Sequence, residues 1–300
     1  MEPRARSKGS LLVKQGQVIR YWLYGDKGVP MILCNSLLGG VGAWMPFVRH
    51  FASSHRLLLW EYQGHGLSAG SGRAEVSVRS FAEDSLRLLA GAGIERAIFV
   101  GLGLGVQVVF EAVRTSPQSV LSLVGISGAE DGQLSGIAPP PLAHLLSRWL
   151  NRMMLPLGVP VWRFVHAAWA AYLPLHRKSR RHPDQEEQAA GGREDSRWVE
   201  KISRTDPQVG LRILASMLFY RPDRLLPLVG IPVLILGGTE DRLVSPDRYA
   251  EMARRIPGSR LVLLPGCSHS LMDQEPAQVN RTVEEFLLEQ GVVRPLPIGG

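Results

Sequence analysis

The segment 100–106 reads Val-Gly-Leu-Gly-Leu-Gly-Val, and it joins a short apolar run to a run of helix formers. The apolar run at 96–100 predicts a buried strand, and residues 107–114 predict the helix that leaves it. Glycines at alternate positions allow the strained backbone and the close contacts of a sharp strand–turn–helix joint. Such a joint lifts its central side chain out over the edge of a sheet, and here the central residue is Gly103.

Strand and helix patterns alternate along much of the chain. Residues 11–14 and 18–24, joined by Gln-Gly-Gln, predict an opening hairpin. Further strands are predicted at 29–34, 56–62, 96–100, 120–126, 231–236 and 260–264, and helices at 77–92, at 107–114, after Pro246 and at 277–290. Strands that alternate with helices favour a mainly parallel sheet covered by helices on both faces. The sequence therefore predicts one α/β core, formed by residues 1–131 and 223–300.

Residues 132–222 interrupt this alternation and carry helical patterns without a strand pattern. We predict that they form a helical cap. Its aromatic residues predict a packing face against the core and the lining of an apolar substrate pocket; the three that we place in the pocket are Trp149, Trp162 and Trp169. A basic run at 175–182 adds a second interpretation, contact with an anionic membrane surface, which we rank well behind the first.

Composition narrows the function classes. The chain of 300 residues is 45% hydrophobic with a net charge of +7, and it shows neither a membrane-spanning run nor an apolar signal segment. Its two cysteines imply no disulfide framework and suit a reducing compartment, so a cytoplasmic protein is expected. The neighbours of the cysteines show no metal-ligand spacing, and no nucleic-acid module accompanies the basic run. We therefore expect no cofactor, no metal and no nucleic-acid partner.

Several loops, taken in order, resemble the α/β-hydrolase fold family over nearly all of the chain except the cap. The joint at Gly103 follows the fifth predicted strand, where that family carries a Gly-x-Ser-x-Gly nucleophile elbow. Residues 237–246 resemble the acid loop of the family, and residues 264–269 resemble its histidine loop. The resemblance implies an eight-stranded, mainly parallel sheet with a helical cap after the sixth strand. It also puts Asp241 in the catalytic-acid position and His269 in the catalytic-base position.

Residues 35–39, Asn-Ser-Leu-Leu-Gly, are similar to the oxyanion loop of the 3-oxoadipate enol-lactonase branch. The resemblance implies an oxyanion hole formed by the backbone N–H groups of Leu37 and Leu104, with Ser36 facing the substrate pocket. The Gly-His-Gly turn of the family recurs at 64–66, and we interpret its histidine as structural.

Glycine at the elbow excludes an acyl-enzyme at residue 103, and with it ordinary two-step serine esterase chemistry. Four alternatives stay open. In the first, His269 and Asp241 activate water directly, and in the second His269 is the general base of a lyase, isomerase or cyclase. In the third, the protein is inactive and binds a ligand or a protein partner. The fourth is a nucleophile from elsewhere, for which the candidates are Ser36, Cys267 and Ser268.

The retained acid and base favour hydrolase-like or base-catalysed activity on a small apolar ester, lactone or other carbonyl compound. A catalytically inactive binding protein is the alternative. A dinucleotide site is excluded, because its fingerprint needs Gly or Ala where Val106 stands and belongs to the first strand rather than the fifth.

Overall fold

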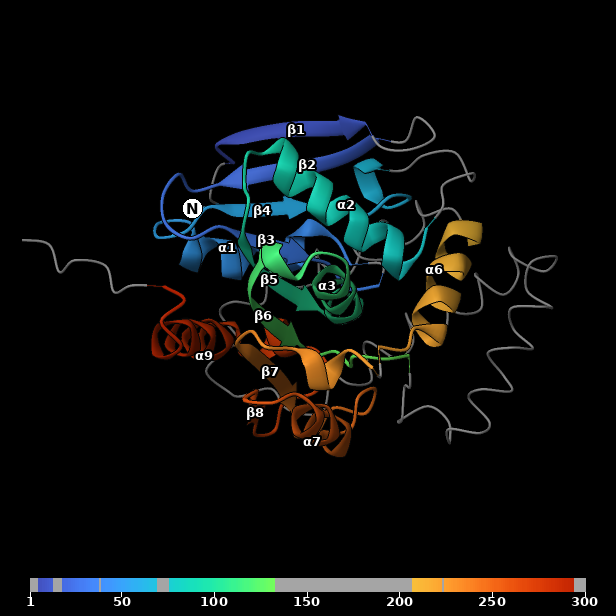
Figure 1. Cartoon of the computed structure of the whole chain (residues 1–300), viewed down its shortest axis with the longest axis vertical. Helices are drawn as coiled ribbons and strands as arrows, with labels where there is room; N and C mark the ends of the chain where they lie inside the picture. Colours follow the sequence, from blue (N-terminus) through green and yellow to red (C-terminus); the bar gives the residue numbers. More distant parts are fainter. Residues whose placement is uncertain are drawn as a thin grey trace, which may run out of the picture.

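The computed structural model describes residues 5–12, 18–37, 39–68, 76–132, 207–222 and 224–293. They form an eight-stranded sheet in the order β1-β2-β4-β3-β5-β6-β7-β8 (Figure 1). The strands are β1 (Ser7–Leu12), β2 (Val18–Tyr24), β3 (Met31–Cys34), β4 (Leu57–Trp60), β5 (Ala97–Leu102), β6 (Val120–Ile126), β7 (Val233–Gly238) and β8 (Arg260–Leu264). Strands β1, β2 and β4 pair antiparallel, and every pair from β4 to β8 is parallel. The predicted mainly parallel sheet is confirmed.

Helices cover both faces of the sheet. The helices are α1 (Met45–Phe51), α2 (Val78–Gly91), α3 (Leu104–Thr115), α6 (Pro207–Phe219), α7 (Pro246–Arg255), α8 (Leu271–Gln274) and α9 (Pro276–Glu289). Buried residues of α2, α3 and α7 belong to one hydrophobic cluster, and those of α1, α8 and α9 belong to a second. The sheet therefore separates two helical layers (Figure 1).

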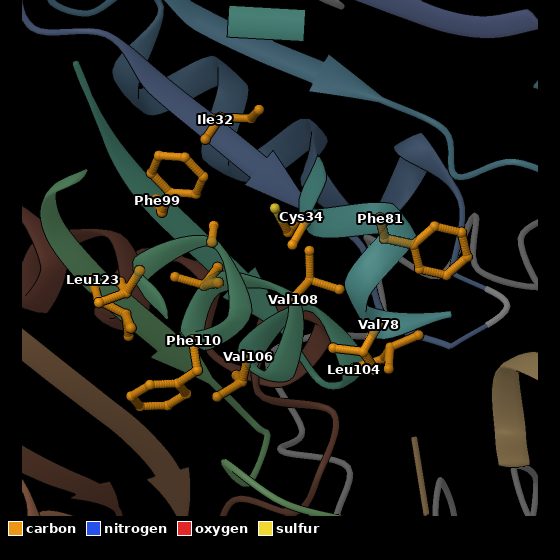
Figure 2. Packing of buried hydrophobic residues seen from close by; sticks show 14 of the residues in the cluster. Ile32, Cys34, Val78, Phe81, Phe99, Leu104, Val106, Val108, Phe110 and Leu123 are labelled. Atoms are coloured by element: carbon orange, nitrogen blue, oxygen red, sulfur yellow. The ribbon is translucent and has the colours of Figure 1, made fainter. Parts of the chain in front are cut away.

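The alternation of side chains along β3 connects the sequence to these two layers. Ile32 and Cys34 lie in the cluster with α2 and α3, whereas Met31 and Leu33 lie in the cluster with α1 and α9. Because successive side chains of a strand point to opposite faces, a fully apolar strand is buried on both. Figure 2 shows the first cluster, in which side chains of α2 and α3 meet those of the strands; it labels Ile32, Cys34, Val78, Phe81, Phe99, Leu104, Val106, Val108, Phe110 and Leu123.

Two elements begin three or more residues away from the predicted position. The first strand spans Ser7–Leu12, four residues earlier than expected, and residues 13–17 lie outside the described part. Its side chains are mostly exposed because β1 is an edge strand, so it lacks the apolar run that marks the inner strands. Helix α3 begins at Leu104, before the predicted residue 107, because the glycine turn leads directly into the first helical turn.

Most of the predicted cap, residues 133–206, lies outside the described residues, and so do Trp149, Trp162 and Trp169. The described end of that segment is α6, which lies at the end of the sheet toward which β4 points (Figure 1). Its Ser216 hydroxyl accepts a hydrogen bond from the backbone N–H of Val78 at 2.9 Å. Within the described ranges, no helix is long and apolar enough to cross a bilayer.

Candidate functional site

The elbow at Gly103 has the sharp geometry that the sequence predicts. Gly103 directly follows β5 and is the N-cap of α3, with φ 56° and ψ −115°; a positive φ favours glycine. Its N–H donates to the carbonyl of Ile126 on the neighbouring strand at 2.9 Å, and its carbonyl accepts from the N–H of Val106 at 3.1 Å. These bonds hold the turn between β5, β6 and α3, although residue 103 has no side chain to present.

Ser36 lies directly beside Gly103. A β-carbon on residue 103 would lie 3.0 Å from Ser36 Cβ, 3.6 Å from Ser36 Cα and 3.8 Å from the carbonyl oxygen of Ser127. These are the three nearest atoms, so the Ser36 hydroxyl oxygen lies no closer than the last of them. Ser36 therefore presents its β-carbon, rather than its hydroxyl, to the vacant nucleophile position. The expectation that Ser36 faces a substrate pocket stays a prediction.

Asp241 is a buried carboxylate with hydrogen bonds to both of its oxygens. Oδ1 accepts the N–H groups of Leu243 and Val244 at 2.9 and 3.0 Å, and Oδ2 accepts the hydroxyl of Tyr249 at 2.7 Å. Burial acts to raise the pKa of this carboxyl, but the bonds from His269, Val244 and Tyr249 outweigh it and lower the pKa below its ordinary value. Asp241 is therefore ionised near neutral pH.

His269 is oriented by this carboxylate. Its Nδ1 lies 2.9 Å from Asp241 Oδ2. An ionised carboxylate only accepts hydrogen bonds, so Nδ1 carries the proton in the neutral ring and Nε2 keeps a free lone pair. The His269 side chain is 29% exposed while that of Asp241 is 0% exposed, so the imidazole forms the accessible end of the pair. This arrangement suits a histidine that takes up a proton at Nε2.

The sheet explains why residues far apart in sequence meet. Asp241 follows β7 and His269 follows β8, and these strands are parallel neighbours, so their loops emerge at the same edge. The two loops are also joined directly, because the N–H of Glu240 donates to the carbonyl of Cys267 at 2.8 Å. Gly103 and Ser36 follow β5 and β3 at the same carboxyl edge.

Two of the candidate substitute nucleophiles, Ser268 and Cys267, have surroundings that oppose a nucleophilic role. The Ser268 hydroxyl and N–H both donate to Gln274 Oε1, at 3.1 and 2.8 Å. Cys267 is buried, and burial raises the pKa of its thiol, as do the nearby carboxylates of Glu275 and Glu240, so the reactive thiolate is disfavoured. No hydrogen bond joins Cys267 or Ser268 to the imidazole of His269 within the described residues.

The structural interpretation of His65 agrees with its surroundings. Its ring is buried beside Tyr62 and Phe81, and Nδ1 lies 3.2 Å from the carbonyl of Gln63. Burial lowers the pKa of His65 to about 4, so the ring is neutral at ordinary pH. This histidine belongs to the packing of the turn after β4.

The two predicted oxyanion donors, Leu104 and Leu37, directly follow Gly103 and Ser36 in the chain. Leu104 is the first residue of α3, where backbone N–H groups have no partner within the helix. Leu37 follows Ser36 and packs against the first hydrophobic cluster. Among the described residues, no group of three His, Cys, Asp or Glu side chains could hold a metal ion.

Two residues near the site had no signal in the sequence. Tyr249 reaches Asp241 from the first turn of α7. Ser127, beside the elbow, has φ 46° and a buried hydroxyl without a hydrogen-bond partner among the described residues. The bond of Tyr249 and the burial of Ser127 both depend on how β6, β7 and α7 pack. No local sequence pattern could therefore have predicted the role of either residue.

Comparison with known proteins agrees with this geometry. A family model described as α/β hydrolase fold matches residues 29–276. A protein of Agrobacterium fabrum (strain C58), named as a provisionally assigned carbamate hydrolase, RutD, is 27% identical over 266 residues, which is 88% of this chain and 95% of the relative. The protein of the same name in Stutzerimonas stutzeri (strain A1501) is 26% identical over 290 residues, 91% of this chain and 97% of the relative.

Solved structures give the same fold. A hydrolase from Pseudomonas aeruginosa PA01 matches with a TM-score of 0.74 at 20% identity, covering 95% of this chain and 100% of that one. An enol-lactonase from Burkholderia xenovorans LB400 matches with a TM-score of 0.73 at 21% identity, covering 93% and 99%. At such identities the likeness supports the fold rather than the substrate. The matched family model, the strand order and the elbow together show that this chain belongs to the α/β-hydrolase fold family.

Proposed function

We propose that this protein hydrolyses a small carbonyl compound, such as a carbamate, lactone or ester, through water activated by His269 and Asp241. The observation that carries the proposal is the 2.9 Å contact between His269 Nδ1 and a buried carboxylate, which favours the tautomer that is unprotonated at Nε2 of the more exposed imidazole. Relatives named as carbamate hydrolases and a structural neighbour that is an enol-lactonase support the choice of substrate class.

The proposed reaction needs no covalent intermediate. His269 Nε2 takes a proton from water as the water oxygen forms its bond to the carbonyl carbon. The backbone N–H groups of Leu37 and Leu104 receive the negative charge that develops on the carbonyl oxygen. The bond to the leaving oxygen or nitrogen then breaks, and His269 returns the proton to that atom. Asp241 keeps the imidazole in the required tautomer and stabilises its charged form.

A panel of small carbamates, lactones and short-chain esters tests this proposal. His269→Gln should lower the turnover of any substrate found by about 10²–10⁴-fold, because it removes the general base. Asp241→Asn should also lower turnover, because an amide can stabilise the tautomer of His269 that carries its proton on Nε2 and cannot act as the base. His50→Gln is the matched control, because His50 forms a second His–carboxylate contact, 3.0 Å from Glu284, and should leave turnover unchanged.

A serine-directed fluorophosphonate separates water activation from a substitute nucleophile. Water activation predicts that no serine is modified and that activity survives the reagent. Modification of Ser36 with parallel loss of activity would overturn the non-covalent mechanism, and it would assign the attack to that residue.

The second candidate function is that of an inactive binding protein. The close approach of Ser36 to residue 103 favours it. The Ser36 β-carbon borders the place of the missing nucleophile, which narrows the room for an attacking water. Under this alternative no compound in the panel is turned over, and a bound ligand keeps its affinity in His269→Gln.

A further inference from the structure

We infer that Tyr249 is a positioning residue for the acid–base pair: its hydroxyl fixes Asp241 Oδ2 and shares that oxygen with His269. The inference rests on the proposed function, since it gives Tyr249 a part in the pair that would activate water. Its central observation is that one carboxylate oxygen receives both the Tyr249 hydroxyl, at 2.7 Å, and His269 Nδ1, at 2.9 Å.

The carboxylate is saturated by its donors. Two backbone N–H groups bind Oδ1 and two side chains bind Oδ2, which makes four hydrogen bonds to a group with about four acceptor sites. Each donor withdraws charge from the carboxylate, so Tyr249 weakens Asp241 Oδ2 as an acceptor for the imidazole. Asp241 thereby acts as a fixed anion that orients His269 rather than as a proton acceptor.

The fold holds the Tyr249 hydroxyl in place. Tyr249 is fully buried, and its ring lies over Gly237 of β7, where a β-carbon would come within 2.4 Å of the ring atoms. The preceding residue, Arg248, binds Glu130 at 2.9 Å and Asp131 at 2.7 Å in the segment that follows β6. Helix α7 is thus attached to β7 and to the segment after β6, and the ring has little freedom to move away from Asp241.

The hydroxyl remains a donor at every working pH. Burial raises the pKa of Tyr249 well above its ordinary value, and the neighbouring charge of Asp241 acts in the same direction. The protonated phenol can only point its hydrogen at the carboxylate, because an ionised carboxylate offers no hydrogen in return.

The test is Tyr249→Phe, which removes the hydroxyl and keeps the ring. Its first readout is the ¹H NMR signal of the His269 Nδ1–H proton, assigned by its absence in His269→Gln. We expect a downfield shift, because Asp241 Oδ2 becomes the stronger acceptor once it loses one donor. The second readout is stability against pH. The loss of stability at acid pH should begin at a higher pH in the variant, since the carboxylate of Asp241 loses a hydrogen bond that favours its charged form.

Tyr220→Phe is the matched control, because the Tyr220 hydroxyl also donates to a buried carboxylate, Glu111 Oε2, at 3.1 Å. This control should leave the His269 signal unchanged. An unchanged or upfield signal in Tyr249→Phe would overturn the inference, and so would equal shifts in both variants. If the Nδ1–H proton exchanges too fast to be seen, the pH at which stability is lost in acid is the deciding measurement. Neither readout uses a substrate, so the result is independent of whether the proposed hydrolysis is found.

Discussion

Ser36 closely borders the position that a side chain on residue 103 would fill: a β-carbon on residue 103 would lie 3.0 Å from the β-carbon of Ser36. Ser36 has little room to retreat, because the preceding Asn35 is fixed. The Asn35 amide donates to the carbonyl of Trp60 and accepts from Trp44 Nε1 at 2.7 Å, and its backbone carbonyl accepts the Tyr62 hydroxyl at 2.8 Å. The two positions are therefore coupled, and one cannot be enlarged without affecting the other.

The first prediction concerns the restored nucleophile. Gly103→Ser should fold but lose about 1–2 kcal/mol of stability, because a side chain is placed at a positive φ and against Ser36. Adding Ser36→Gly should recover part of that loss and increase fluorophosphonate labelling of the new serine. Urea unfolding and intact-mass measurement check both effects. Equal labelling of the single and double variants would show that Ser36 does not restrict residue 103.

The sequence predicted the parts of the site that depend on local pattern. The strand–turn–helix joint, the acid loop and the histidine loop each lie within a short segment, and the structure brings Asp241 and His269 to 2.9 Å. Their catalytic roles remain a prediction. The close approach of Ser36 to residue 103 was not predicted, because the distance between two loops depends on the register of β3 against β5.

The missed features are long-range or lack a distinctive pattern. Tyr249 is one of many polar positions on an amphipathic helix, and only the packing of α7 on β7 directs its hydroxyl to Asp241. The exposed edge strand β1 was misplaced because its side chains do not follow the apolar pattern of the inner strands. Inner strands such as β3 were easy to predict because burial on both faces demands continuous apolar residues.

The second prediction tests the glycine that follows the elbow. A β-carbon on Gly105 would lie 2.1 Å from the carbonyl oxygen of Cys34, so Gly105→Ala must push α3 away from β3. We expect a loss of at least 2 to 3 kcal/mol, of the order seen for overpacked cores. Gly230→Ala is the control, because a β-carbon there meets nothing within 4 Å. Urea unfolding that gave equal stabilities for the two variants would contradict the close packing of the elbow.

The third prediction concerns backbone strain beside the elbow. Ser127 has φ 46°, and its buried hydroxyl has no hydrogen-bond partner in the part of the chain that the structure describes; each feature is unfavourable for serine. Ser127→Gly should therefore raise stability by about 1 kcal/mol, even after the greater freedom of glycine in the unfolded chain is counted. Gly128→Ala should act in the opposite direction, since its β-carbon would lie 2.3 Å from the Gly103 carbonyl oxygen. A thermal melt in which Ser127→Gly unfolds earlier would show that the hydroxyl is needed.

The last prediction is that stability depends on pH through Glu130, which lies in the segment after β6. The Glu130 carboxylate is fully buried, and burial raises its pKa from 4.5 to about 7 even though Arg248 and Arg255 lie against it. At a pH between 4.5 and about 7, the folded protein keeps a proton on Glu130 that the unfolded chain releases. Raising the pH through this window therefore favours the unfolded chain, and stability falls until about pH 7.

Glu130→Gln removes this titration while keeping the shape of the protonated side chain. The stability of the variant relative to the natural protein should rise between pH 5 and pH 8, by roughly 3 kcal/mol at most. Glu251→Gln is the control, because Glu251 contacts the same Arg248 guanidinium at 2.6 Å but is 45% exposed. Urea unfolding at the two pH values decides the matter. A constant difference for Glu130→Gln would mean that Arg248 and Arg255 keep Glu130 ionised despite its burial, and α7 would then be held to the segment after β6 by a permanent ion pair.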